Sequence, residues 1–124
     1  MDDFTKISKK TPKTLRPEEK IEYQLITSLK KTPIVLDKVK KFTFGSTTKC
    51  DLRLQLGTIS DLHASLKWEK SAFVLKDENS TNGTYLNDKR IKVPASLKDG
   101  DKIKIGKFVL KYKEKKIRVK KANK

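Results

Sequence analysis

Hydrophobic and polar residues alternate in several short segments of the chain, and this alternation predicts β-strands. The clearest cases are CDLRLQL (50–56), ASLKWE (64–69) and KFVLKYK (107–113), in which every second residue is apolar. IEYQLITSLK (21–30) starts with the same pattern, and AFVLKDE (72–78) is rich in residues that favour strands. A period of two places successive side chains on opposite faces of a strand. The chain is therefore predicted to be built mainly from short strands.

Turn residues between these segments indicate how the strands connect. Asn87-Asp88 predicts a hairpin between GTYL and KRI, and Asp99-Gly100-Asp101 predicts a turn before KIKIG. Strands separated by turns at intervals of roughly 8–12 residues are typical of β-sandwiches and barrels. Outside the N-terminal third, no long segment has a helical period. An all-β fold is expected.

The two ends of the chain differ from the middle. Residues 1–20 contain two prolines and few apolar side chains, and KEKKIRVKKANK at the C-terminus is strongly basic. Segments that are poor in apolar residues and rich in charge favour flexible arms. The predicted organisation is a flexible arm over 1–20, one domain over 21–113 and a basic tail over 114–124.

Composition and charge restrict the class of protein and of partner. The chain has 124 residues, of which 35% are hydrophobic and 37% charged, and its formal net charge is +16. One domain with a modest core fits this length, and the charge favours acidic surfaces or polyanions as partners. A single cysteine, no apolar run near the roughly 20 residues of a membrane span and no secretory signal point to an intracellular protein without a membrane partner.

The residues needed for catalysis are scarce. His63 and Cys50 are the single histidine and cysteine, and they are well separated in the sequence. Nucleophilic catalysis needs a nucleophile, a base and an orienting group in contact, and a zinc site needs several ligands. No glycine-rich phosphate loop precedes a predicted helix. We expect a protein that is not an enzyme and has no metal, no cofactor and no small-molecule substrate.

Three short motifs occur in a fixed order: FGS at 44–46, SDLH at 60–63 and STNGT at 80–84. This order resembles the forkhead-associated (FHA) domain family, whose pattern is Gly-Arg, then Ser-x-x-His, then Ser-x-Asn-Gly-Thr. KCDLRLQL, LKDENSTNGTYLNDKRI and LKDGDKIKIG resemble further segments of that family. The resemblance extends over about residues 21–113. It implies a β-sandwich of about eleven strands that binds phosphothreonine peptides on loops at one end.

The resemblance assigns phosphopeptide binding to residues that suit it chemically. A phosphothreonine carries close to two negative charges and three acceptor oxygens, so hydroxyl groups of Ser60 and Thr81 are suitable donors. The Asn82 amide can reach a peptide backbone, and Gly83 permits a positive φ in a tight turn after it. Shaping of the loop by local hydrogen bonds is the alternative role for Ser60 and Thr81. Gly45 suits a close approach of two backbones.

Three further residues bear on the loops and on their charge. The family resemblance implies that His63 is structural and ties the binding loops together. Lys49 and Arg53 lie near the first motif and are candidates for basic support of a bound phosphate.

Two of the expected phosphopeptide-binding positions depart from the family pattern. Ser46 stands where the family has arginine, and Asp61 follows the motif serine where the family often has Arg, Asn or Lys. The first change removes a cation that binds phosphate, and the second adds a charge that repels it. We therefore expect weakened phosphothreonine binding.

Two other functions remain open at this point. The domain could instead serve as a phosphate-independent adaptor or as a subunit of a larger complex. The basic arms could contact RNA or DNA, mainly through phosphates, because Tyr112 is the one aromatic residue in the strongly basic C-terminal stretch. A phosphorylated protein or a protein subunit is the expected partner, and the basic tail together with the habits of the family favours a nuclear location.

Overall fold

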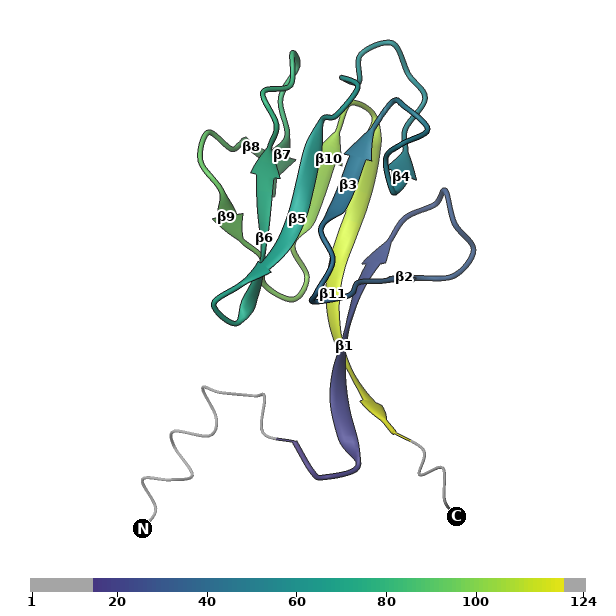
Figure 1. Ribbon diagram of the computed structural model, residues 1–124, viewed down its shortest axis with the longest axis vertical. Helices are drawn as coiled ribbons and strands as arrows, with labels where there is room; N and C mark the ends of the chain where they lie inside the picture. Colours follow the sequence, from purple (N-terminus) through teal and green to yellow (C-terminus); the bar gives the residue numbers. More distant parts are fainter. Residues whose placement is uncertain (1–14, 120–124) are drawn as a thin grey trace. The chain divides into compact units, whose positions relative to one another are not determined.

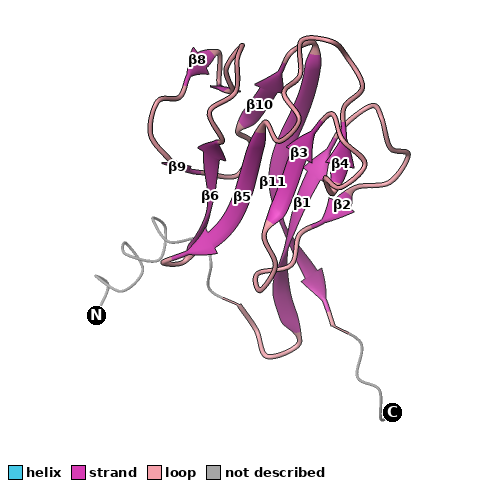
Figure 2. Ribbon diagram, turned by 45° about the horizontal axis from the view of Figure 1, so that its top comes forward, coloured by secondary structure: helices cyan, strands magenta, loops and turns pink. Residues whose placement is uncertain are grey.

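The computed structural model describes residues 15–119, which form eleven β-strands and no helix (Figures 1 and 2). The chain divides into two units, one of Met1–Glu22 with Lys115–Lys124 and one of Tyr23–Glu114. Between residues 15 and 119 no helix is long and apolar enough to cross a membrane. The all-β prediction with about eleven strands is confirmed.

The strands form two sheets. The six-stranded sheet has the order β2-β1-β11-β10-β7-β8, and its strands are β1 (Glu19–Ile26), β2 (Ile34–Val35), β7 (Tyr85–Leu86), β8 (Lys89–Arg90), β10 (Lys102–Ile105) and β11 (Phe108–Arg118). The five-stranded sheet has the order β4-β3-β5-β6-β9, and its strands are β3 (Phe42–Gly45), β4 (Leu52–Arg53), β5 (Ala64–Glu69), β6 (Ala72–Asp77) and β9 (Ala95–Ser96). β3 and β4 pair in parallel, whereas β3, β5, β6 and β9 pair antiparallel.

The hydrophobic core of the Tyr23–Glu114 unit lies between the two sheets. Edge-to-face ring contacts join the two sheets. The centroid of the Phe73 ring lies 5.5 Å from that of Tyr23 and 6.4 Å from that of Tyr112. Apolar side chains on alternate positions of both sheets are fully buried, among them Leu25, Phe44, Leu66, Leu75, Ile103, Ile105 and Leu110. Burial of alternate residues on both inner faces defines a β-sandwich.

Turn chemistry fixes the hairpin that the sequence predicts at 87–88. Asn87 and Asp88 have φ values of 50° and 73°, and they connect β7 and β8 in register, with Tyr85 opposite Arg90. Two successive positive φ angles give the type I′ turn that suits the twist of a two-residue hairpin, and Asn and Asp tolerate that conformation. Gly100 in the second predicted turn also has a positive φ, of 92°.

One predicted strand is much shorter than expected. The alternation in 50–56 predicts a strand throughout, but only Leu52 and Arg53 pair, in β4. The Leu54 amide donates to the Gly45 carbonyl at 2.8 Å, and the chain then bends away into a loop. Leu54 is still fully buried. An alternating apolar pattern can therefore reflect the burial of a loop residue as well as the pairing of a strand.

In the unit Met1–Glu22 with Lys115–Lys124, strand structure extends past the predicted domain limits of 21 and 113. β1 begins at Glu19, β11 continues to Arg118, and the Val119 amide donates to the Glu18 carbonyl at 2.7 Å. Lys116 Nζ lies 3.9 Å from Glu19 Oε1, within ion-pair distance. A hydrogen bond from the Arg16 amide lowers the pKa of Glu19, and the nearby cations act in the same direction. The rest of the predicted arms, 1–14 and 120–124, lies outside the described residues.

Candidate functional site

Three loops meet at one end of the sandwich and carry the predicted motif residues (Figure 1). They connect β3 to β4, β4 to β5, and β6 to β7. The Ser46 amide donates to the Ser60 carbonyl at 3.1 Å, which joins the first loop to the second. The Thr81 amide donates to Ser60 Oγ at 3.0 Å, and Asn82 Nδ2 donates to the Thr58 carbonyl at 2.9 Å. These bonds join the second loop to the third, so the structure brings Ser46, Ser60, Thr81 and Asn82 together.

His63 lies fully buried beneath these loops. Its Nδ1 accepts a hydrogen bond from the Ser60 amide at 3.1 Å, and its Nε2 lies 2.8 Å from the Gly83 carbonyl oxygen. An amide N–H can only donate and a carbonyl can only accept, so the ring is neutral with its proton on Nε2. Both ring nitrogens are therefore used to connect two loops.

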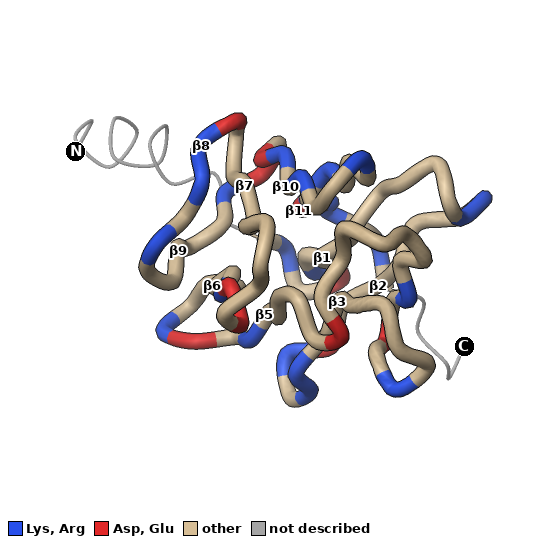
Figure 3. The backbone as a smooth tube through the Cα atoms, turned by 90° about the horizontal axis from the view of Figure 1, so that it is seen from above, with Lys and Arg blue, Asp and Glu red and all other residues tan. Residues whose placement is uncertain are grey.

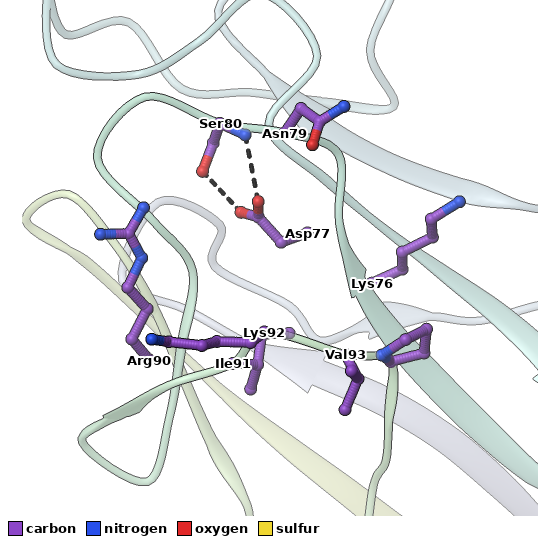
Figure 4. A pocket seen from close by; sticks show the side chains of 9 residues that line it. Lys76, Asp77, Asn79, Ser80, Arg90, Ile91, Lys92 and Val93 are labelled. Carbon is purple, nitrogen blue, oxygen red and sulfur yellow. Dashed lines mark hydrogen bonds between the residues drawn. The ribbon is translucent and has the colours of Figure 1, made fainter.

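Asp77, at the end of β6, organises the loop from β6 to β7. Its Oδ1 accepts from the Ser80 hydroxyl at 2.5 Å, and its Oδ2 accepts from the Ser80 amide at 3.0 Å (Figure 4). Oδ1 also accepts from the Thr84 hydroxyl at 2.6 Å. Ser80 Oγ in turn accepts from the Gly83 amide at 3.0 Å. The dense run of small polar residues is thus a set of fixed hydrogen bonds around one carboxylate.

The protonation of Asp77 reflects this network. Partial burial raises the pKa of its carboxyl group, but the hydrogen bonds from Ser80 and Thr84 outweigh burial, so the pKa is lowered overall. Asp77 is not among the site residues predicted from the sequence. Its role could have been predicted from its position three residues before Ser80, because a carboxylate at that spacing can accept hydrogen bonds from the turn that follows it.

Two glycines are required where the loops come close together. Gly83 has a φ of 92°, and its Cα faces the side chain of Arg90 without room for a Cβ. At Gly45, a Cβ would collide with the Asp61 carbonyl oxygen and with the sulfur of Cys50. Gly45 therefore allows the first and second loops to touch, and Gly83 allows the third loop to turn.

Comparison with known proteins identifies the family of this arrangement. The FHA domain family model matches residues 42–106, which include all three motifs and all three loops. The chain belongs to the FHA domain family. A stretch of 62 residues is 37% identical to the human proliferation marker protein Ki-67, and this stretch makes up 50% of this chain and 2% of Ki-67. A stretch of 68 residues is 39% identical to the glycogen accumulation regulator GarA of Mycobacterium tuberculosis, covering 55% of this chain and 41% of GarA.

A solved structure supports the same assignment. It comes from a structural and functional analysis of phosphothreonine-dependent FHA domain interactions. The two proteins align with a TM-score of 0.66 and 25% identity, over 74% of this chain and 95% of that one. The chain thus spans nearly the whole of that solved FHA domain, but less than half of the curated relatives Ki-67 and GarA.

The two departures from the FHA pattern contact each other. The Ser46 hydroxyl donates to Asp61 Oδ1 at 3.3 Å, and the Cys50 thiol donates to the Asp61 carbonyl at 3.3 Å. Asp61 is exposed, so its carboxylate faces solvent beside Ser60. A negative charge therefore stands at the rim of the loops, at the point where the family pattern has a cation on the first loop.

A cation from β4 reaches the same place. Arg53 Nε donates to the Ser46 carbonyl at 2.9 Å, which holds the guanidinium group against the first loop. With its amide oxygen turned toward Arg53, Gln55 accepts from Nη1 at 2.9 Å. Lys49 is exposed on the first loop and has no hydrogen bond or ion pair to any residue between 15 and 119. Arg53 is therefore the better fixed of the two predicted basic residues.

The donors that face solvent define what the site can bind. Ser60 Oγ accepts from Thr81, which leaves the hydroxyl hydrogen of Ser60 to donate elsewhere. The hydroxyl of Thr81 is exposed, and Asn82 still has its oxygen and a second amide hydrogen after bonding to Thr58. Two hollows flank the third loop, one of about 490 Å³ beside Asn82 and Tyr85 and one of about 600 Å³ between Asn79 and Arg90 (Figure 4).

Proposed function

We propose that this FHA domain is a non-enzymatic interaction module that binds a phosphothreonine-containing segment of a partner protein. The observation that carries the proposal is the position of the Ser60 hydroxyl. Three loop contacts hold Ser60, through its amide, its carbonyl and its Oγ. Its hydroxyl hydrogen is not used in these three contacts and can donate to a phosphate oxygen. The solved FHA domain from the study of phosphothreonine-dependent interactions, 25% identical to this chain, supports the same function.

Preorganisation is the physical advantage of such a site. A hydroxyl that is already fixed loses little conformational freedom when the ligand arrives, so more of each hydrogen bond appears as affinity. The Asn82 side chain is fixed in the same way by its bond to Thr58. In this proposal Ser60 and Thr81 bind the phosphate, and Asn82 donates to the peptide backbone next to it.

The balance of charge sets the strength of binding. A phosphothreonine carries about −1.5 to −2 charges at neutral pH. Two unit charges at about 4 Å repel by roughly 4 kcal/mol in an effective dielectric of about 20, so Asp61 opposes binding. Arg53, held against Ser46, offsets part of this repulsion. We infer a weaker affinity than that of an FHA domain with arginine at position 46.

A binding role also fits the state of the histidine better than catalysis does. Both nitrogens of His63 make loop hydrogen bonds, so its use as a general base would break the contact with Ser60 or with Gly83. The Cys50 sulfur contacts the Asp61 carbonyl and Thr47. Neither residue is arranged to activate the other.

The test is a titration with a library of phosphothreonine peptides and their unphosphorylated twins. NMR amide shifts at Ser60, Thr81 and Asn82 are expected with phosphorylated peptides alone, and Ser60→Ala is expected to abolish them. Ser96→Ala, on β9 of the five-stranded sheet, is the matched control and leaves binding unchanged. If no library member binds, or if the unphosphorylated twins bind as well, the domain docks its partner without phosphate and the proposal is wrong.

A further inference from the structure

The outer face of the six-stranded sheet carries an unusual row of cations. Ile103, Leu110 and Tyr112 are fully buried in the core, so the residues that alternate with them in β10 and β11 point away from it. Strand register shows which residues share that outer face. Lys104 pairs with Tyr85 of β7, and Tyr85 pairs with Arg90 of β8. We call the outer-face set the lysine face, and it consists of Tyr85, Arg90, Lys102, Lys104, Lys111 and Lys113.

The arrangement of charge on this face does not favour the folded state. Lys102 and Lys111 lie directly opposite each other in the β10–β11 ladder. Like charges at opposed positions on neighbouring strands destabilise a sheet. Among residues 15–119 the face has one ion pair, between Lys102 and Asp88 at 3.9 Å, and the Asp88 side chain is 74% exposed. Such a cluster gains from an external anion.

The other sheet gives an internal comparison. On the five-stranded sheet, Lys41 and Lys76 both lie within ion-pair distance of Glu78, at 3.6 and 4.0 Å. Glu69 at the end of β5 adds another acid there. On that sheet two lysines thus share one carboxylate, whereas on the lysine face Lys102 pairs with Asp88, and Lys104, Lys111 and Lys113 have no ion pair with the residues from 15 to 119. Figure 3 shows Lys and Arg positions along β8, β10 and β11.

We propose that the lysine face binds single-stranded nucleic acid. Alternate residues of a strand lie about 6.6 Å apart and neighbouring strands about 4.8 Å apart, so the face is a regular grid of cations to which a flexible phosphodiester chain can adapt. Tyr85 lies half-buried between Arg90 and Lys104 and offers a ring on which a base can stack. An aromatic residue flanked by cations on an open sheet is a known platform for single strands.

The lysine face borders the phosphopeptide site but does not include Ser60, Thr81 or Asn82, the residues proposed to bind the phosphopeptide. Tyr85 and Lys104 line the hollow beside Asn82, and the Arg90 side chain lies against Gly83 of the third loop. The two proposals can still fail independently, because the substitutions that test them are made at different residues.

The test compares two triple variants of the full chain that have the same net charge. Lys104→Gln with Lys111→Gln and Lys113→Gln removes three cations from the lysine face. Lys67→Gln with Lys70→Gln and Lys76→Gln removes three from the β5–β6 region of the other sheet. Each lowers the formal net charge of +16 by three, so long-range attraction changes equally in both. The probes are fluorescein-labelled oligouridine, oligothymidine and a duplex DNA, and binding is read by fluorescence anisotropy.

The expected outcome is specific for position. At about 50 mM salt the lysine-face variant binds oligouridine and oligothymidine at least about tenfold more weakly than wild type, and the β5–β6 variant binds nearly as wild type does. Each lost phosphate contact lowers the slope of log Kd against log salt by about 0.7 for a single strand, so the lysine-face variant loses about 2 from that slope. A difference between the oligouridine and oligothymidine affinities then tells RNA from DNA preference.

A separate variant tests the stacking of bases on Tyr85. Tyr85→Leu keeps the apolar bulk and all charges, and it is expected to weaken both single strands by about tenfold while leaving duplex binding unchanged. Thermal unfolding of every variant checks that it is folded. Equal losses in the two triple variants, stronger binding of duplex than of single strands, or no binding by the wild-type protein at about 50 mM salt would each overturn the proposal.

Discussion

The hydroxyl of Ser46 donates a hydrogen bond to the carboxylate of Asp61 at 3.3 Å. These two residues are the positions at which the chain departs from the FHA pattern, and they prove to be partners. Because an arginine at position 46 would stand beside this carboxylate, the two departures cannot be treated as independent. The contact keeps a negative charge at the rim of the loops, next to Ser60.

Restoring the cation therefore requires both changes. Ser46→Arg with Asp61→Asn is expected to strengthen binding of a phosphothreonine peptide by about tenfold or more, because one charge-assisted hydrogen bond is worth about 1.5–3 kcal/mol. Ser46→Arg alone is expected to gain much less, since Asp61 would pair with the new guanidinium group. Isothermal titration calorimetry with a peptide selected from the library measures both. An unchanged affinity in the double variant would contradict the charge argument.

His63 is predicted to be essential for stability and not for chemistry. His63→Ala removes the partner of the Ser60 amide and of the Gly83 carbonyl and leaves a cavity at a fully buried position. A buried polar group without a partner costs about 1–3 kcal/mol, so a loss of at least about 3 kcal/mol in the free energy of unfolding is expected. Urea denaturation measures it. Leu62→Ala, at the exposed neighbouring position, is the control, and an equal small effect in both variants would refute the role.

The lowered pKa of Asp77 predicts how the stability of the fold depends on pH. Its pKa is lowered in the folded state, so its stabilising effect is complete above the unfolded value of about 3.9 and is lost as the pH falls through the folded value. Asp77→Asn lacks this titration. The difference in free energy of unfolding between wild type and Asp77→Asn should therefore be large near neutral pH and shrink below about pH 4. Other acids titrate in both proteins and cancel, so a constant difference would show that the hydrogen bonds do not depend on the charge.

Much of the fold could be predicted from local pattern. The alternation in 64–69 and 107–113 gave strands because one face of each is buried, and Asn87-Asp88 gave a hairpin because both residues tolerate a positive φ. The short strand at Leu52–Arg53 was not predictable. Its length depends on a hydrogen bond from Leu54 to Gly45, which is a contact between segments, and alternation along one segment does not record it.

The loop positions of the candidate site residues could be predicted from the sequence, but the hydrogen bonds between them could not. Motif order placed Ser46, Ser60 and Thr81 in loops, but no spacing in the sequence indicates that Ser46 bonds to Asp61 or that Arg53 bonds to the Ser46 carbonyl. The first contact depends on the antiparallel pairing of β3 with β5, and the second depends on the parallel pairing of β3 with β4. Tertiary geometry thus decides the electrostatics of a site whose residue types the sequence already displays.

The glycines provide a prediction that separates steric exclusion from backbone strain. Gly45→Ala places a Cβ against the Asp61 carbonyl, and Gly83→Ala adds a positive φ of 92° to a clash with Arg90. Gly100→Ala has the same φ with nothing within 4 Å, and Gly57→Ala has neither problem. We expect Gly57→Ala to be nearly neutral, Gly100→Ala to lose about 1 kcal/mol through strain, and Gly45→Ala and Gly83→Ala to lose at least about 2 kcal/mol. Urea denaturation of the four variants gives the order, and a Gly45→Ala protein as stable as Gly57→Ala would show that the first and second loops do not touch there.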